Sequence, residues 1–250
     1  MSLLLNNSGI TQTSKFQNNN NPFSFLKDPT AVLMSDKRSI GCWGERNYLL
    51  KDLSHFILAF NYPNRLGKMA MAVDYFGGVN YNESSFLFDY AHHLNDKSSI
   101  GILFQSQLVK LVQHQKELRL GAVLGGNFML SEKLSTSICL NNYLYNSSLS
   151  GFSSISKTDF WCNLDYNVTN SFYLSSTLLK QNNQTPNLIL GFMYHFRKKI
   201  FIKYGFSSGI NQMYASVGFA LNNMRLEITN SFHPKLGITP SLSIVTNKSQ

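Results

Sequence analysis

Charge is scarce in this sequence of 250 residues. Lys, Arg, Asp and Glu make up only 14% of the chain, whereas soluble domains carry roughly 25%. Aromatic residues reach 13%, yet the mean hydropathy of −0.13 is too low for a bundle of membrane helices. This combination is expected when apolar and polar residues alternate one by one, as they do in a barrel that faces lipid outside and water inside.

Long apolar runs, cysteine motifs and catalytic signatures are also missing. No stretch approaches the roughly 18 consecutive apolar residues of a transmembrane helix. The three cysteines form no CxxC pair, and an odd number cannot pair fully within the chain. There is no GxSxG, HExxH or phosphate-binding loop. His92 and His93 come nearest to a metal motif, but neighbouring strand residues face opposite sides. We expect no catalytic residue, metal or cofactor.

What the sequence does contain is a persistent alternation from Ser39 to Thr246. Phe56, Leu58 and Phe60 share one face of a predicted strand, and similar apolar stripes recur to the end of the chain. The pattern predicts an all-β transmembrane antiparallel barrel of about 14 strands, each of roughly 9–12 residues. A secreted β-sandwich also alternates and is the alternative fold.

Charged side chains fall on the faces opposite the apolar stripes. In a barrel these faces line the lumen, where buried charges require partners. Asp89, Asp165 and Glu227 are candidate catalytic carboxylates, but a role in lumen ion pairs is the preferred interpretation. The candidate lumen charge network comprises Lys68, Asp74, Asp89, Arg119, Asp165, Lys203, Arg225 and Glu227.

Predicted connections alternate between short and longer ones. The short set lies near residues 63–66, 95–97, 131–133, 169–170, 197–199 and 222–223, and the longer set near 78–84, 112–116, 146–157, 181–186 and 207–211. Short periplasmic turns and longer external loops are typical of bacterial outer-membrane barrels, which predicts that both termini are periplasmic. Basic residues lie in the short turns and not on one face, so the net charge of +9 does not indicate nucleic acid as a partner.

The chain divides into three parts. Residues 1–38 are rich in Asn, Gln and Ser and show no period; they predict an irregular N-terminal segment that could plug the lumen. Residues 39–246 form the predicted barrel, and 247–250 a C-terminal tail. Residues 1–10 lack a basic region and do not resemble a secretory signal. An outer-membrane barrel needs one, so we expect that the numbering omits it or that the chain begins after it.

Several short motifs resemble those of small outer-membrane barrels of Bacteroidota akin to PorV and PorQ, which are themselves similar to the FadL long-chain fatty-acid transporters. Residues 25–31, FLKDPTA, resemble the "NPA"-type start of the mature proteins, and residues 44–54, 74–77 with 81–84, and 232–240 resemble later motifs. The chain departs from the pattern at Asp28, where Asn is usual, and it is shorter than the fatty-acid transporters.

The resemblance implies a bacterial outer membrane, with lipid and a larger membrane complex as partners. The first functional hypothesis is therefore a non-catalytic accessory subunit of a type IX secretion or barrel-assembly (Bam) machine, held through its outer wall. The alternative is a FadL-like transporter or pore for a small hydrophobic solute. A third hypothesis, an outer-membrane enzyme, lacks a recognisable nucleophile and base.

Overall fold

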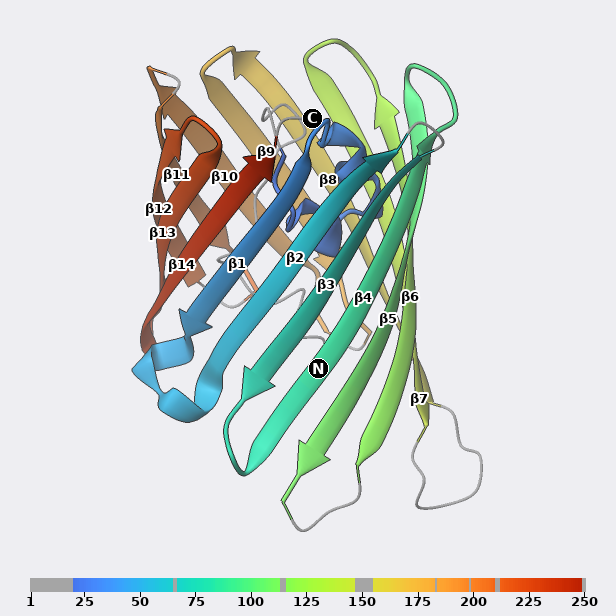
Figure 1. Ribbon diagram of the computed structural model, residues 1–250, viewed down its shortest axis with the longest axis vertical. Coiled ribbons are helices and arrows are strands. Elements are labelled where there is room, and N and C mark those ends of the chain that lie inside the picture. The colour runs from blue at the N-terminus through green and yellow to red at the C-terminus, as the bar shows by residue number, and fades with distance from the viewer. Residues whose placement is uncertain are drawn as a thin grey trace.

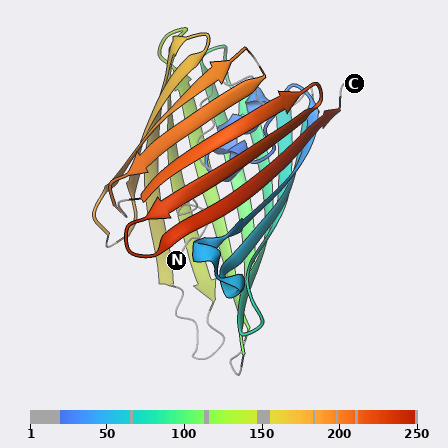
Figure 2. The ribbon, with the colours of Figure 1, turned by 90° about the vertical axis from the view of Figure 1, so that its left-hand side faces the viewer.

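The structure is a closed antiparallel barrel. The computed structural model describes residues 20–64, 67–112, 116–146, 155–182, 184–197, 199–209 and 212–248. Within these ranges fourteen strands pair in sequence order, and β1 pairs with β14 to close the barrel (Figure 1). The strands are strongly tilted against the barrel axis (Figure 2). The predicted transmembrane β-barrel is confirmed, and the sandwich alternative is wrong because a sandwich does not close.

The strand bounds follow the alternation closely. The barrel begins one residue earlier and ends two residues later than expected, at Arg38 and Lys248. The strands are β1 Arg38–Arg46, β2 Ser54–Asn64, β3 Gly67–Gly77, β4 Tyr81–His93, β5 Ser98–Leu111, β6 Glu117–Met129, β7 Leu134–Asn146, β8 Ile155–Thr169, β9 Phe172–Lys180, β10 Asn187–Phe196, β11 Ile200–Ser207, β12 Gln212–Leu221, β13 Met224–His233 and β14 Gly237–Lys248.

The two faces of the wall differ as the period of two requires. Outward side chains such as Phe86, Phe104 and Leu190 are about half exposed, at 52%, 51% and 46%. Their sequence neighbours Leu87 and Gln105 point inward and are buried. Large apolar side chains facing out and buried polar ones facing in are the arrangement of a membrane barrel.

The expected alternation of connection lengths holds only in part. At one end of the barrel, where β1 starts and β14 stops, the connections are short (Figure 1). At the other end, three connections are as short as these, because β4 already begins at Tyr81, β12 at Gln212 and β14 at Gly237. Gly77 and Gly237 turn the chain there at positive φ, a conformation that glycine adopts without steric cost.

The connection from β1 to β2 contains two short 3-10 helices, η4 Asn47–Leu49 and η5 Lys51–Leu53. The β1–β14 ladder ends at the pair Glu45–Ser241. The next residue of β14 is Pro240, which has no N–H to donate to a ladder. The chain leaves the sheet at this point, and the Tyr48 N–H donates to Thr239 Oγ1 at 3.0 Å.

The described part of the N-terminal segment lies inside the barrel. Its 3-10 helices η2 Ser24–Leu26 and η3 Pro29–Met34 sit in the lumen near the end that carries the C-terminus (Figure 1). Asp28 begins η3: its side chain accepts from the Thr30 N–H at 2.9 Å, and Pro29 supplies a helical φ at the first position. Among the described residues, no helix is long and apolar enough to cross a membrane. We call residues 20–36 the plug.

Candidate functional site

The plug packs against one half of the lumen wall through apolar contacts. Its buried side chains Phe25, Val32 and Leu33 join one core cluster with inward residues of the wall. The wall side of this cluster is rich in small residues, which leave room for the plug backbone: Ala59, Ala70, Ala72 and Ala91. η3 lies against β3, β4, β5 and β6. The first strands of the barrel therefore hold the plug by hydrophobic burial.

Two glycines permit the closest approach. A Cβ on Gly101 would stand 2.8 Å from the backbone carbon of Pro29, and one on Gly125 would stand 3.0 Å from its Cδ. These residues pair across β5 and β6. Any side chain at Gly101 would displace the backbone of η3, which cannot move as a flexible side chain can.

Replacing Gly101 by Leu is therefore expected to dislodge the plug. Trypsin should then cut after Lys27 in the folded variant at least several-fold faster than in the folded wild-type protein. Mass spectrometry locates the cut. The matched control is Gly126→Leu, because Gly126 faces outward and its added Cβ would meet only Phe128 at 3.6 Å. Equal cleavage of the two variants would contradict the packing of the plug on β5.

Three hydrogen bonds tie the plug backbone to separate strands. The Trp161 indole N–H on β8 donates to the Lys27 carbonyl at 2.8 Å. Lys68 Nζ on β3 donates to the Leu33 carbonyl at 2.7 Å and pairs with Asp36 at 2.8 Å. Asn61 on β2 donates to the Asn21 carbonyl at 3.3 Å. Lys68, predicted to belong to a lumen network, thus anchors the plug.

Lys27 gives the plug a pH dependence. Its side chain is half-buried in the lumen, and burial lowers the pKa of its amine to about 7. A released plug would regain the ordinary pKa of about 10.4 and bind the proton more tightly. Docking should therefore strengthen as the pH rises from about 7 towards 10 and change little below 7.

This dependence can be followed by acrylamide quenching of fluorescence, because both tryptophans, Trp43 and Trp161, join the core cluster that contains the plug. Quenching of the wild-type protein should fall as the pH rises through this window. Lys27→Met should show little dependence on pH. An unchanged pH profile in this variant would refute the assignment to Lys27.

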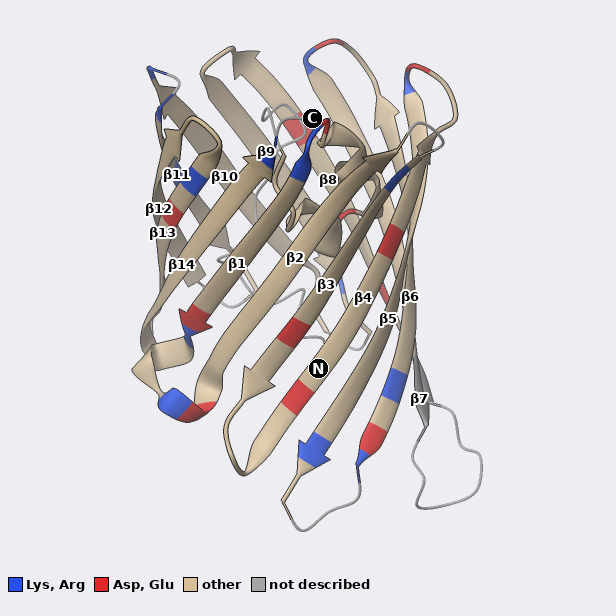
Figure 3. Cartoon of the chain, viewed as in Figure 1, with Lys and Arg blue, Asp and Glu red and all other residues tan. Residues whose placement is uncertain are grey.

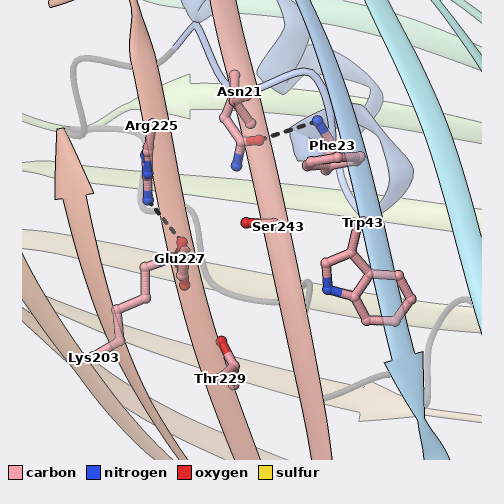
Figure 4. A pocket seen from close by; sticks show the side chains of 9 residues that line it. Asn21, Phe23, Trp43, Lys203, Arg225, Glu227, Thr229 and Ser243 are labelled. Atoms are coloured by element: carbon pink, nitrogen blue, oxygen red, sulfur yellow. Dashed lines mark hydrogen bonds and ion pairs between the residues drawn. The ribbon is translucent and has the colours of Figure 1, made fainter. Parts of the chain in front are cut away.

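A second charged group occupies the opposite wall. Glu227 on β13 lies 2.8 Å from Lys203 Nζ on β11, reached across β12, and 3.1 Å from Arg225 on its own strand (Figure 4). The Arg225 guanidinium stands over the Phe201 ring at 4.1 Å, a cation–π distance. All three charged side chains are mostly buried, and Glu227 is the ion-pair partner of both Lys203 and Arg225.

A narrow cavity separates the plug from this wall. Phe23 and Trp43 line one side of it, and Lys203, Arg225 and Glu227 line the other (Figure 4). Its volume is about 20 Å³, enough for about one water. In this closed arrangement the gap combines an aromatic side with a charged side.

A third group lies on β1, β2 and β3. His55 Nε2 is 2.5 Å from Asp74 Oδ1, and His55 Nδ1 is 3.7 Å from Glu45 Oε1. Of these three residues, only Asp74 was predicted from the sequence to belong to the lumen network; Glu45 and His55 were not. Both have the inward parity of their strands, since outward Phe56 follows His55 directly, so the alternation itself contained the signal.

The remaining predicted network residues lie apart. Arg119 pairs with Glu117 at 2.9 Å along β6, and Asp165 stands opposite Ser135 and Ser175 in the ladders of β8. Asp89 is fully buried at the plug interface, and neither carboxylate oxygen has a hydrogen-bond partner in the described structure. The structure therefore brings Lys203, Arg225 and Glu227 together, while the other five predicted residues lie apart from this group. Charged positions are scattered over the strands of the barrel (Figure 3).

No metal centre emerges from the residues that the structure describes. No three His, Cys, Asp or Glu side chains among them are grouped so as to hold an ion. Cys42, Cys139 and Cys162 are free thiols. His92 and His93 are both exposed at the end of β4.

The fold is similar to that of several solved transporter and channel structures. The Ralstonia pickettii toluene transporter TbuX matches with a TM-score of 0.68 and 9% identity, over 92% of this chain and 94% of that chain. The CymD monoaromatic hydrocarbon channel matches with a TM-score of 0.66 and 11% identity over the same shares. A Pseudomonas aeruginosa FadL homologue matches with a TM-score of 0.57 and 11% identity, over 91% of this chain and 94% of that chain.

No protein-family model matches the sequence, and no curated protein sequence does. The likeness is therefore one of fold. The FadL-like part of the expected resemblance is confirmed at that level, while the finer likeness to PorV and PorQ, and to Bacteroidota, stays a prediction. The chain has the fold of the FadL-like fourteen-stranded outer-membrane barrels.

Proposed function

We propose that this protein is an outer-membrane channel for a small apolar solute, with the plug controlling passage. The observation that carries the proposal is that η3 of the plug lies against β3–β6, while a gap remains beside β11, β13 and β14. A solute passing there would contact Phe23 of the plug, Trp43 of β1 and Val245 of β14, which supply the apolar part of the lining. Proteins of the same fold include the toluene transporter TbuX and the monoaromatic hydrocarbon channel CymD.

This proposal replaces the accessory-subunit hypothesis as the preferred function. Nothing in the fold comparison points to a secretion or assembly machine, whereas a plugged lumen with a gap is what a gated channel requires. The proposed location is the bacterial outer membrane, and the proposed role is non-catalytic. Both ends of the barrel chain would face the periplasm, since they share the end with the uniformly short turns.

Uptake of radiolabelled toluene by Gram-negative cells with an intact outer membrane tests the proposal. Expression should raise uptake, and Phe23→Ala should raise it further by removing the ring that lines the gap. Phe60→Ala is the matched control, because Phe60 faces outward on β2. The channel proposal fails if neither the wild type nor Phe23→Ala changes uptake of toluene or of a small sugar. If a large partner also co-purifies in equal amount, the accessory hypothesis is favoured.

A further inference from the structure

The outer wall carries an apolar groove at the seam between β1 and β14. Its volume is about 690 Å³, within the roughly 300–1,000 Å³ of small-molecule sites. Cys42 and Gly44 form its floor, and Phe56 of β2, Leu242 of β14 and Ile228 of β13 form its sides. The three side residues are between 44% and 57% exposed. The groove is separate from the lumen gap and independent of the proposed channel function.

The local sequence explains the depression. Most outward positions of the wall hold large side chains, but β1 places Cys42 and Gly44 at two consecutive outward positions. Gly44 stands next to Phe56 in the ladder of β1 with β2 and next to Leu242 in that with β14. Two small residues between rows of larger ones leave a groove that runs along β1.

One end of this groove is positively charged. Arg46 is exposed and lines the groove at the last outward position of β1. It lies where Pro240 ends the β1–β14 ladder. No hydrogen bond or ion pair among the described residues engages its guanidinium.

The connection from β1 to β2 indicates how deep this end of the groove lies in the membrane. Leu49 and Leu50 follow Arg46 in the chain and are 62% and 55% exposed, and Lys51 comes next. Exposed leucines beside cations, at the end of a lipid-facing wall, are expected at the boundary between hydrocarbon and head groups. Arg46 would therefore meet the phosphates of the bilayer, while the groove extends towards its apolar interior.

We propose that the groove binds one acyl chain of a membrane lipid whose phosphate-bearing anionic head group pairs with Arg46. The apolar floor and sides exclude a polar ligand. An arginine fork binds a phosphate through paired hydrogen bonds and attracts a net negative charge. The site therefore discriminates an anionic from a zwitterionic head group and is more specific than the general lipid-facing surface.

Native mass spectrometry of the full chain, supplied with equal amounts of phosphatidylglycerol and phosphatidylcholine of identical chains, tests the site. Wild type should retain one lipid and favour phosphatidylglycerol by about fivefold, since one basic residue near a membrane surface contributes on the order of 1 kcal/mol. Arg46→Gln should keep a lipid but lose the preference. Lys110→Gln is the control, because Lys110 is an exposed cation at the same end of β5. Equal retention of both lipids by wild type would overturn the proposal.

Filling the groove should remove the lipid altogether. Gly44→Leu places a side chain on the floor, and Ala215→Leu, at an outward position of β12 away from the groove, should retain the lipid. Cys42 offers a second readout, which leaves every residue of the groove unchanged. In protein lacking the thiol of Cys162 (Cys162→Ser), phosphatidylglycerol should slow maleimide labelling of exposed Cys42 at least several-fold, and prior labelling should block lipid retention. Labelling at the same rate with and without this lipid would show that the groove is empty.

Discussion

Replacing Phe104 by Lys is expected to destabilise the folded barrel by about 2–4 kcal/mol, whereas Gln105→Lys should cost much less. The two residues are neighbours near the middle of β5, and successive strand residues face opposite sides. Phe104 is 51% exposed towards lipid, and Gln105 is buried towards the lumen. A lysine at the first position would place its charge in hydrocarbon. At the second it would enter a polar lumen.

The pair can be measured by urea unfolding in lipid vesicles, followed by tryptophan fluorescence. Both variants have the same net charge and the same added side chain, so general effects of lysine cancel. Similar losses of unfolding free energy would mean that the two faces of β5 meet similar surroundings. That result would argue against a lipid-facing outer wall.

The fold itself was open to prediction because its main signal is local. Alternation at a period of two depends only on neighbouring residues, and it assigns Phe56 outward and His55 inward without knowledge of the pairing. Connections were less predictable. Gly77 allows a tight turn where a longer loop was expected near residues 78–84, and no periodic pattern in the sequence marks the length of this turn.

The plug surface could not be recognised from the same signal. The inward residues Ile57, Ala59, Leu87 and Leu103 are apolar, like the outward residues beside them. In the sequence, these apolar inward residues only weaken the alternation of apolar and polar positions along each strand. Their role becomes visible once the N-terminal segment is placed against them, because they bury its apolar side chains in one cluster.

The lumen charges show a similar limit. Lys203 and Glu227 pair across an intervening strand, and Asp74 meets His55 through the register of β2 with β3. Partners of this kind depend on strand register and barrel closure, which a single sequence does not specify. The sequence could assign these residues to the lumen but not to one another.

Glu227→Gln is expected to lower the free energy of unfolding by about 3–5 kcal/mol, the usual cost of removing one partner from a buried ion group. Lys203 and Arg225 would lose their shared carboxylate while remaining 7% and 17% exposed. Glu117→Gln is the matched control. Glu117 pairs with Arg119 at a comparable distance but is 32% exposed, so its loss should cost about 0–1 kcal/mol.

The same urea titration distinguishes two descriptions of the lumen beside the plug. A large loss for Glu227→Gln, largely recovered when Lys203→Met and Arg225→Met are added, would show that water does not compensate the two cations. The gap between plug and wall would then be closed to bulk solvent at rest. A loss as small as that of Glu117→Gln would mean that water already screens the group. The lumen would then admit polar solutes beside the plug, and an apolar-selective channel would need another barrier.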